Sequence, residues 1–190
     1  MAAATVLFSA LMASDAKSLA EGLRRRDPEL LDRLIEQYQY RLHRYLLHLT
    51  GNPVTAEDLF QETWIRVLER GHQYDGRSRF ETWLFAVARH LAIDLSRRKK
   101  PDDLDSLTEE PAATSASAFE QVASRETEDQ IQVWLGQVPA VYREVLVLRF
   151  QEELTLEEIG AVLGAPLATV KSRLYRGLHA LRALRLGGSA

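Results

Sequence analysis

The chain has 190 residues, no cysteine and a formal net charge of −3, so it holds neither a disulfide framework nor a cysteine-ligated zinc site. Its length allows one or two modest hydrophobic cores. The five histidines have no metal-ligand spacing, and we expect neither a metal nor a cofactor. Residues 101–130 carry one basic and nine acidic groups, whereas the segments before and after them carry more basic than acidic groups. The small net charge is therefore the sum of two mildly basic parts of the chain and an acidic segment between them.

The first residues are apolar but do not have the pattern of a secretory signal. Residues 1–16 contain no basic start, and Ser9 and Ser14 interrupt their apolar run. No segment approaches the roughly 20 consecutive apolar residues that are needed to span a bilayer. We therefore expect residues 1–16 to be a loose tail or a leading turn of helix within an N-terminal extension at 1–27, and the protein to stay in the cytoplasm without inserting into a membrane.

Three helices are predicted between residues 28 and 100. Apolar residues keep helical spacing from Pro28 to Leu49, and Gly51-Asn52-Pro53 ends this run. Thr55 and Asp58 have the spacing of a capping box for a second helix that ends at Gly71. The buried face of this helix is expected to contain Phe60, Thr63, Trp64, Val67 and Leu68. Short connections and one-sided apolar faces predict a compact helical bundle.

The outer face of the second helix is acidic and also carries one apolar residue. Asp58, Glu62, Ile65 and Glu69 recur at helical spacing, with Gln61 beside them. An acidic stripe with an exposed isoleucine is typical of a protein-docking face. The alternative is an ordinary solvated face on which Glu62 pairs with Arg66. The spacing alone favours the solvated face.

The loop and the third helix combine basic and aromatic residues. Ser78 and Glu81 predict the start of this helix, which ends near Pro101. Basic side chains between Arg77 and Lys100 alternate with Phe80 and Trp83, a pattern that suits single-stranded nucleic acid because backbone charge and base stacking both contribute to binding. The alternative is that both aromatic residues belong to the core, since they lie on the apolar stripe.

Residues 101–125 are acidic and rich in serine, alanine and proline, and they predict a linker. A second bundle begins near Glu126, with Ile131, Trp134 and Leu135 on its first helix. Pro139 opens another helix, on which the apolar positions are Val141, Val145, Leu148 and Phe150.

The end of the chain predicts a helix-turn-helix. Thr155 and Glu158 form a capping box for a short helix, and Gly164 ends it. Pro166 suits the first turn of the following helix. That helix is expected to bury the stripe Val170, Leu174, Leu178 and Leu181.

The other face of this last helix carries Thr169, Lys171, Ser172, Arg173 and Arg176. Between Ile159 and Ala190 there are five basic residues and no acidic one, so this segment attracts phosphate. A helix presented after a tight turn can enter a DNA major groove, where such side chains read base edges. The alternative is a helical hairpin with a solvated basic face.

Four segments in this order closely resemble one family. They are Tyr38 to Leu49, Thr55 to Trp64, Phe80 to Arg98, and Thr169 to Arg173. They are similar to the bacterial extracytoplasmic-function (group 4) sigma factors of RNA polymerase, over about residues 28–100 and 126–185. The resemblance implies an all-α protein of two small bundles joined by a flexible acidic linker, the second containing the helix-turn-helix. It also implies a subunit that is not an enzyme, binds core RNA polymerase through the β′ clamp and β flap, and directs it to promoter DNA under the control of an anti-sigma factor.

The resemblance also divides the chain and assigns its surfaces. It implies an N-terminal extension at 1–27, a region 2 domain at 28–100, a linker at 101–125 that threads the polymerase channel, a region 4 domain at 126–186 and a tail at 187–190. Docking on the polymerase is implied for Asp58, Leu59, Gln61, Glu62 and Ile65. Melting and holding of the −10 element is implied for Arg77, Ser78, Arg79, Phe80, Trp83, Arg89, His90, Asp94, Arg97 and Arg98. Recognition of the −35 element is implied for Ala168, Thr169, Lys171, Ser172, Arg173, Tyr175 and Arg176.

Two positions depart from the family pattern, which often has asparagine at His90 and glycine at Ala168, and both departures concern promoter preference. One competing hypothesis is a transcription regulator that uses only its helix-turn-helix, with the first bundle as a sensor or dimerisation module. The other is an enzyme based on the carboxylates Asp58 and Glu62 or Glu157 and Glu158. Neither pair is accompanied by a histidine, a lysine or a phosphate-binding loop that would give it a catalytic role.

Overall fold

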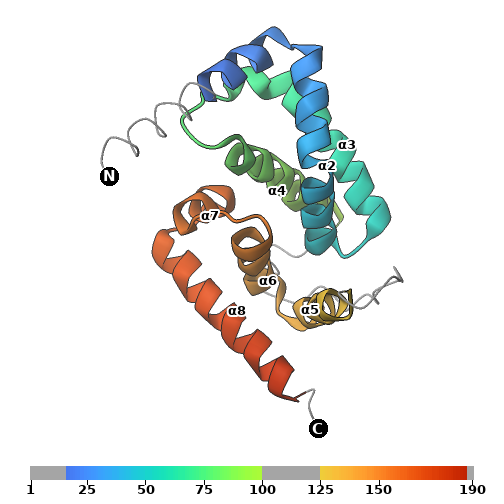
Figure 1. Ribbon diagram of the computed structural model, residues 1–190, viewed down its shortest axis with the longest axis vertical. Helices are drawn as coiled ribbons and strands as arrows, with labels where there is room; N and C mark the ends of the chain where they lie inside the picture. The colour runs from blue at the N-terminus through green and yellow to red at the C-terminus, as the bar shows by residue number, and fades with distance from the viewer. Residues whose placement is uncertain (1–15, 100–124, 188–190) are drawn as a thin grey trace.

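The computed structural model describes residues 16–99 and 125–187, and the regular structure of these residues is entirely helical. The helices form two bundles, one from each half of the chain (Figure 1). The prediction of an all-α fold of two small bundles is therefore confirmed. The predictions for residues 1–15, 101–124 and 188–190 lie outside the described residues.

The first bundle contains α2 (Pro28–Thr50), α3 (Pro53–Arg70), the short 3₁₀ helix η1 (Gly71–Gln73) and α4 (Phe80–Lys99). Both ends of α2 have the chemistry that helix ends require. The Asp27 side chain accepts a hydrogen bond from the backbone N–H of Glu29 at 3.1 Å. At the other end, Gly51 adopts the left-handed conformation with φ of 63° and donates its N–H to the Leu47 carbonyl.

Two predicted helix starts are wrong, one by three residues and the other by one. Helix α3 begins at Pro53, and the Asn52 side chain accepts from the backbone N–H of Thr55 at 3.0 Å, so Thr55 lies inside the helix instead of capping it. Asparagine followed by proline is a strong start because proline needs no hydrogen-bond partner at the first helical position. Helix α4 begins at Phe80, and the Glu81 carboxylate accepts from Arg79 Nη2 at 2.8 Å.

The first bundle has a densely packed core. Leu42, Tyr45 and Leu46 of α2 and Leu84 and Phe85 of α4 are fully buried. The rings of Tyr45 and Phe85 meet edge to face with their centroids 5.0 Å apart. On α3, burial is confirmed for three of the five residues of the predicted face, Thr63, Trp64 and Val67. Phe60 is half-buried, and Leu68 is 44% exposed.

Part of the predicted N-terminal extension belongs to this bundle. Residues 16–25 are helical, and Ala20 and Leu23 are buried. The Leu23 side chain lies 3.1 Å from where a Cβ on Gly71 would be, so this helix packs against the end of α3. The two apolar side chains, one turn apart, thus pack part of the predicted extension onto the bundle.

The second bundle contains α5 (Arg125–Gln137), α6 (Ala140–Leu146), η3 (Val147–Gln151), α7 (Leu156–Leu163) and α8 (Leu167–Gly187). Leu135, Val138 and Leu146 form a small core between α5, α6 and α8. Phe150 was expected on the buried face, but it is 59% exposed. The error lies in the spacing, because the stripe of Val141, Val145 and Leu148 continues at Glu152, which is fully buried, whereas Phe150 lies on the opposite face of the helix.

The two bundles pack against each other. Helix α4 lies along α7, and α2 contacts α6 and η3 (Figure 1). One hydrophobic cluster runs from the first bundle into the second, where it includes Val145, Leu148 and Ile159. Within residues 16–99 and 125–187, no helix is both long and apolar enough to cross a membrane.

Candidate nucleic-acid interface

The turn between α7 and α8 has the geometry of a helix-turn-helix. Thr155 Oγ1 accepts from the Glu158 N–H at 3.2 Å, and Glu158 Oε2 accepts from the Thr155 N–H at 2.8 Å. The predicted capping box is confirmed. Gly164 then ends α7 in the left-handed conformation, with φ of 62°. Pro166 immediately precedes α8, and its carbonyl accepts the N–H groups of Thr169 and Val170.

A close backbone approach explains the glycine in the middle of α7. The Ala165 carbonyl oxygen lies 3.0 Å from where a Cβ on Gly160 would be, and the Ala165 N–H donates to the Gly160 carbonyl at 3.0 Å. A side chain at Gly160 would therefore push against the turn. This contact accounts for a residue that is otherwise unfavourable inside a helix.

The buried stripe of α8 differs from the predicted one at a single position. Val170 is fully buried and Leu174 and Leu181 are half-buried, but Leu178 is 44% exposed. Gly177 is buried in its place, because α8 crosses α6 there and the Leu146 side chain lies 3.0 Å from where its Cβ would be. A glycine carries no hydrophobic signal, so apolar periodicity alone could not identify this position.

The opposite face of α8 is open to solvent and basic. Lys171, Ser172 and Arg176 are exposed, and Tyr175 is 73% exposed. Ala168 is also exposed, whereas Thr169 and Arg173 are half-buried. Arg176 Nη1 donates to the Tyr142 hydroxyl at 3.3 Å, which holds one guanidinium along the helix. The structure thus brings the predicted −35 residues together near the N-terminal end of one exposed helix, as major-groove reading requires.

The loop before α4 is held in shape by its own residues. The Tyr74 hydroxyl donates to the Ser78 carbonyl at 2.7 Å, and Asp75 Oδ1 accepts from the Arg77 N–H at 3.0 Å. Gly76 has φ of 71°, and a Cβ there would lie 2.9 Å from the Ala16 carbonyl oxygen. The Arg77 and Ser78 side chains are therefore exposed on a loop of defined shape.

The aromatic residues of α4 separate into core and surface. Phe80 is 4% exposed, and its ring lies 5.5 Å from that of Tyr38 and 5.6 Å from that of Tyr74. Burial in this cluster prevents Phe80 from stacking on a base in this arrangement, so the structure assigns it to the core. Trp83 is half-buried at the edge of the same cluster, 5.8 Å from Phe80. Only Trp83 of these two can both pack and stack.

A hollow of about 370 Å³ lies beside Trp83, between α3 and α4. His90 and Asp94, both predicted −10 residues, line it. Sequence reasoning missed Arg66, Arg70 and Gln73, which line its other side. Arg66 and Arg70 are one helical turn apart, so the sequence shows that they share one side of α3. It does not show that this side of α3 faces α4. The hollow therefore combines two guanidinium groups with one aromatic ring.

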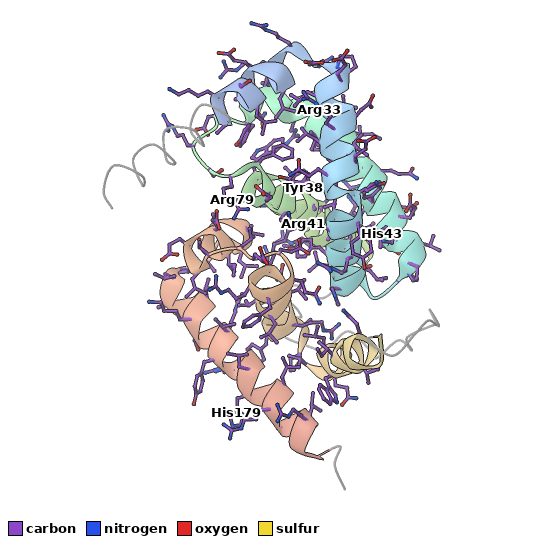
Figure 2. The ribbon with its side chains drawn as sticks, viewed as in Figure 1. Arg33, Tyr38, Arg41, His43, Arg79 and His179 are labelled. Carbon is purple, nitrogen blue, oxygen red and sulfur yellow. The ribbon has the colours of Figure 1, made fainter. Side chains whose placement is uncertain are left out.

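The remaining basic residues of this surface fall into two groups. Arg97 and Arg98 are exposed near the end of α4. Arg79 and Arg89 instead lie toward the second bundle, where Arg89 Nε is 2.8 Å from Glu144 Oε1 and Arg79 Nε is 3.8 Å from Glu158 Oε1. Figure 2 shows Arg79 at the side of α4 that faces α7. The predicted −10 residues are thus only partly free.

The outer face of α3 is exposed at most of the predicted docking positions. Asp58 and Gln61 are exposed and Ile65 is 47% exposed. Glu62 is half-buried and accepts from Arg66 at 2.9 Å, so the predicted ion pair is present. Leu59 is only 5% exposed, and as a core residue it does not belong to the surface. Sequence reasoning missed Leu68, whose exposed side chain lies one turn beyond Ile65.

No group of three or more histidine or carboxylate residues within the described ranges is arranged to hold a metal ion. Of the carboxylates considered for an enzyme, Glu158 caps α7 and Glu62 pairs with Arg66.

Family comparisons match both bundles. The model described as Sigma-70 region 2 matches residues 34–101, and the model described as Sigma-70, region 4 matches residues 134–183. The ECF RNA polymerase sigma factor SigW of Bacillus subtilis is 33% identical over 178 residues, which cover 87% of this chain and 94% of that protein. The chain belongs to the extracytoplasmic-function sigma factors.

Solved structures of similar fold agree with the two-bundle architecture of this sigma factor. CnrH, solved in complex with the cytosolic domain of CnrY, has a TM-score of 0.63 at 22% identity and covers 95% of this chain and 97% of its own. The sigma factor RpoE of Bartonella quintana, crystallised with the anti-sigma factor NepR, has a TM-score of 0.63 at 21% identity and covers 80% and 94%. At these identities the likeness concerns the fold alone.

Proposed function

We propose that this sigma factor binds core RNA polymerase with the outer face of α3 and contacts a promoter with two separate surfaces, one on each bundle. In this account residues 28–100 act as region 2, with the −10 element, and residues 126–186 act as region 4, with the −35 element. Residues 101–125 join them as the linker through the polymerase channel. The activity is recognition without catalysis, and it takes place in the cytoplasm.

The exposed basic face of α8 is the observation that carries the proposal. Its first three turns present Lys171, Ser172 and Arg176 to solvent, behind a turn held by Gly160 and Gly164. Arginine and lysine bind phosphate and guanine edges, and serine and threonine donate to either. We assign Ala168, Thr169, Arg173 and Tyr175 to the same surface because they occupy the same three turns.

The −10 element calls for a different kind of surface, because melted DNA offers single-stranded bases and phosphates. The hollow between α3 and α4 supplies a half-buried Trp83 next to Arg66 and Arg70. Stacking on an aromatic ring contributes about 1–3 kcal/mol per base. Arg77, Arg97 and Arg98 extend this surface as exposed phosphate contacts.

Docking on the polymerase is assigned to Asp58, Gln61, Glu62 and Ile65, with Leu68 added. An exposed apolar pair beside carboxylates suits a basic, amphipathic partner surface such as we propose for the β′ clamp. The second contact, with the β flap, is proposed for the region 4 bundle. We also propose an anti-sigma factor as a partner, since RpoE of Bartonella quintana was crystallised with one.

Charge reversal on α3 tests the docking surface. Asp58→Arg is expected to weaken binding of core RNA polymerase at least tenfold, because a like charge placed in an electrostatic interface repels the partner. The matched control is Glu36→Arg, an exposed carboxylate on α2 outside the proposed surface. Binding is measured by titration of labelled protein with purified core enzyme, and circular dichroism checks that both variants are folded. Equal binding by the two variants would contradict the assignment.

A stand-alone helix-turn-helix regulator is the alternative. It would bind duplex DNA tightly without polymerase, and Asp58→Arg would have no effect on its function. A sigma factor instead requires core enzyme for promoter-specific initiation.

A further inference from the structure

The second bundle contains a hollow of about 700 Å³ between α5, α6, η3 and α8. It lies beside the small core of this bundle, and the core residues Leu135 and Leu146 form part of its wall. Sites for small organic ligands usually have volumes of roughly 300–1,000 Å³. The hollow is therefore large enough to hold such a ligand.

The walls of the hollow are mainly apolar, and part of them is open to solvent. Ile131 on α5 is 41% exposed and Phe150 on η3 is 59% exposed, while Trp134 is half-buried. An apolar ligand in this hollow would remove these side chains from water, which is favourable. The apolar lining residues are Ile131, Trp134, Leu135, Leu146, Phe150 and Leu181.

One side of the hollow is cationic. Arg182 and Arg185 of α8 line it, and both are exposed. Residues three positions apart are neighbours on a helix, so the like charges of these two side chains repel each other. Among the described residues, no carboxylate lines the hollow. An anionic group bound between the two guanidinium groups would relieve the repulsion and accept charge-assisted hydrogen bonds.

The short extent of the walls favours a compact ligand over a docked helix. On α5 the lining residues run from Ile131 to Leu135, and on α8 they run from Leu181 to Arg185. Each of these stretches covers about 6 Å of its helix axis. An amphipathic helix bound in a groove uses anchors up to seven positions apart, or roughly 10 Å. A flexible alkyl chain can instead bend to fill a hollow of this length.

We propose that this hollow binds one free fatty acid, with its alkyl chain against the apolar walls and its carboxylate between Arg182 and Arg185. The cationic side distinguishes this ligand from a neutral or a cationic amphiphile. The ligand contacts α5 and α8 together, so its binding stabilises the second bundle. The hollow includes neither the outer face of α3 nor the first turns of α8, and the inference does not rest on the proposed function.

Dodecanoate, kept below its micelle-forming concentration, is the probe. Isothermal titration calorimetry with the full-length protein measures its affinity and stoichiometry, and we expect one molecule to bind per chain. Dodecyltrimethylammonium has the same alkyl chain and a cationic head, so it should bind at least tenfold more weakly because the two guanidinium groups repel it. Acetate has the carboxylate without the chain and should show no binding at the same concentrations.

Substitutions on the two sides of the hollow test its two parts. Arg182→Gln combined with Arg185→Gln should weaken dodecanoate binding about tenfold, because charge-assisted hydrogen bonds to the carboxylate are lost. Phe150→Ser should weaken it severalfold, because part of the apolar wall is removed. The matched control, Arg24→Gln combined with Arg33→Gln, removes the same charge from the first bundle and should leave the affinity unchanged. All five side chains are exposed, and circular dichroism checks that each variant is folded.

Trp134 provides an independent readout within the hollow. A bound alkyl chain displaces water from its half-buried indole ring, so the fluorescence emission should shift to shorter wavelength as dodecanoate is added. This shift should saturate at the dissociation constant that calorimetry gives. Trp134→Phe retains the other two tryptophans, Trp64 and Trp83, and should bind dodecanoate without the shift.

Equal binding of dodecanoate and dodecyltrimethylammonium would overturn the proposal, as would uptake of many dodecanoate molecules that the arginine variants do not reduce. An acidic amphipathic peptide that binds when dodecanoate does not, and that Phe150→Ser weakens, would show a protein-binding groove instead. A dimer that sedimentation detects and Phe150→Ser dissociates, again without dodecanoate binding, would assign the hollow to a second copy of the chain. None of these results affects the polymerase-binding test of Asp58→Arg.

Discussion

The basic residues on α8 and those at α4 differ in whether carboxylates of the same chain pair with them. On α8, Lys171 and Arg176 are exposed, and among the described residues no carboxylate forms a salt bridge with either. On the first bundle, Arg79 and Arg89 are held by Glu158 and Glu144 of the second bundle. The surface that we propose for duplex DNA is therefore exposed, whereas two of the predicted −10 residues pair with carboxylates of the same chain.

The difference in pairing affects how each of the two proposed DNA surfaces would bind DNA. An exposed basic helix can bind the phosphates of any duplex DNA, and the affinity of this nonspecific binding falls as the salt concentration rises. On the first bundle, Arg79 and Arg89 already have carboxylate partners, so single-stranded DNA would have to replace these partners to bind the two guanidinium groups.

The largest effect is expected from Arg173→Ala on the open face. We expect the variant to bind a duplex promoter fragment containing the −35 element about 1–3 kcal/mol less favourably. If Arg173 reads a base, the preference for that base should also relax. Equilibrium binding at several salt concentrations measures it, and an exposed arginine on α2, Arg33→Ala, serves as the control. A loss of the same size in Arg33→Ala would contradict the assignment of Arg173 to the DNA surface.

Acidification is expected to destabilise the folded chain through His48 of α2. Burial, reinforced by the guanidinium groups of Arg143 on α6 and Arg44 on α2, lowers its pKa from 6.5 to about 4, against an opposing hydrogen bond with Gln151 on η3. The neutral imidazole therefore favours the folded state, and this contribution is fully present above pH 6.5 and is lost as the pH falls toward 4. Between about pH 7.5 and 5, the free energy of unfolding should fall by about 2 kcal/mol.

Denaturant unfolding at the two pH values measures this change. His48→Gln should reduce the pH dependence strongly, whereas His72→Gln, at an exposed histidine, should leave it intact. If the parent and His48→Gln respond equally, His48 is not the titrating group.

The smallest effects concern the turn that presents α8. Gly160→Ala is expected to lower the free energy of unfolding by about 1 kcal/mol, because its Cβ would lie 3.0 Å from the Ala165 carbonyl oxygen. Gly136→Ala in α5 has nothing within 4 Å, so it should raise stability by about 0.5–1 kcal/mol through helix propensity. Denaturant unfolding of both variants checks the opposite signs, and a gain for Gly160→Ala would show that the turn has room to adjust.

The sequence predicted local features well and long-range ones poorly, for physical reasons. The Thr155–Glu158 box and the Gly164 stop depend on residues three or four positions apart, and the structure contains both. Leu178 and Phe150 were placed wrongly because the buried positions next to them, Gly177 and Glu152, are not apolar side chains and give no hydrophobic signal. The Arg41–Glu152 contact joins residues 111 positions apart, and no pattern along the chain relates them.

The same limit applies to the candidate site. The exposed face of α8 could be read from periodicity, because one helix carries all of it. The hollow at Trp83 is lined by both α3 and α4, and the sequence does not show that these two helices lie side by side there. Arg66 and Arg70 of α3 were therefore missed. For Phe80 the apolar stripe left both a core and a DNA-binding role open, and the packing shows that Phe80 is buried, as is Leu59.

Transcription with purified core RNA polymerase tests the central claim most directly, with sheared genomic DNA as template and sequencing of RNA 5′ ends. The account predicts a defined set of start sites that requires both core enzyme and this chain, and that is lost with Asp58→Arg but kept with Glu36→Arg. A chain that binds duplex DNA tightly on its own, yet directs no new start sites when core enzyme is added, would contradict it.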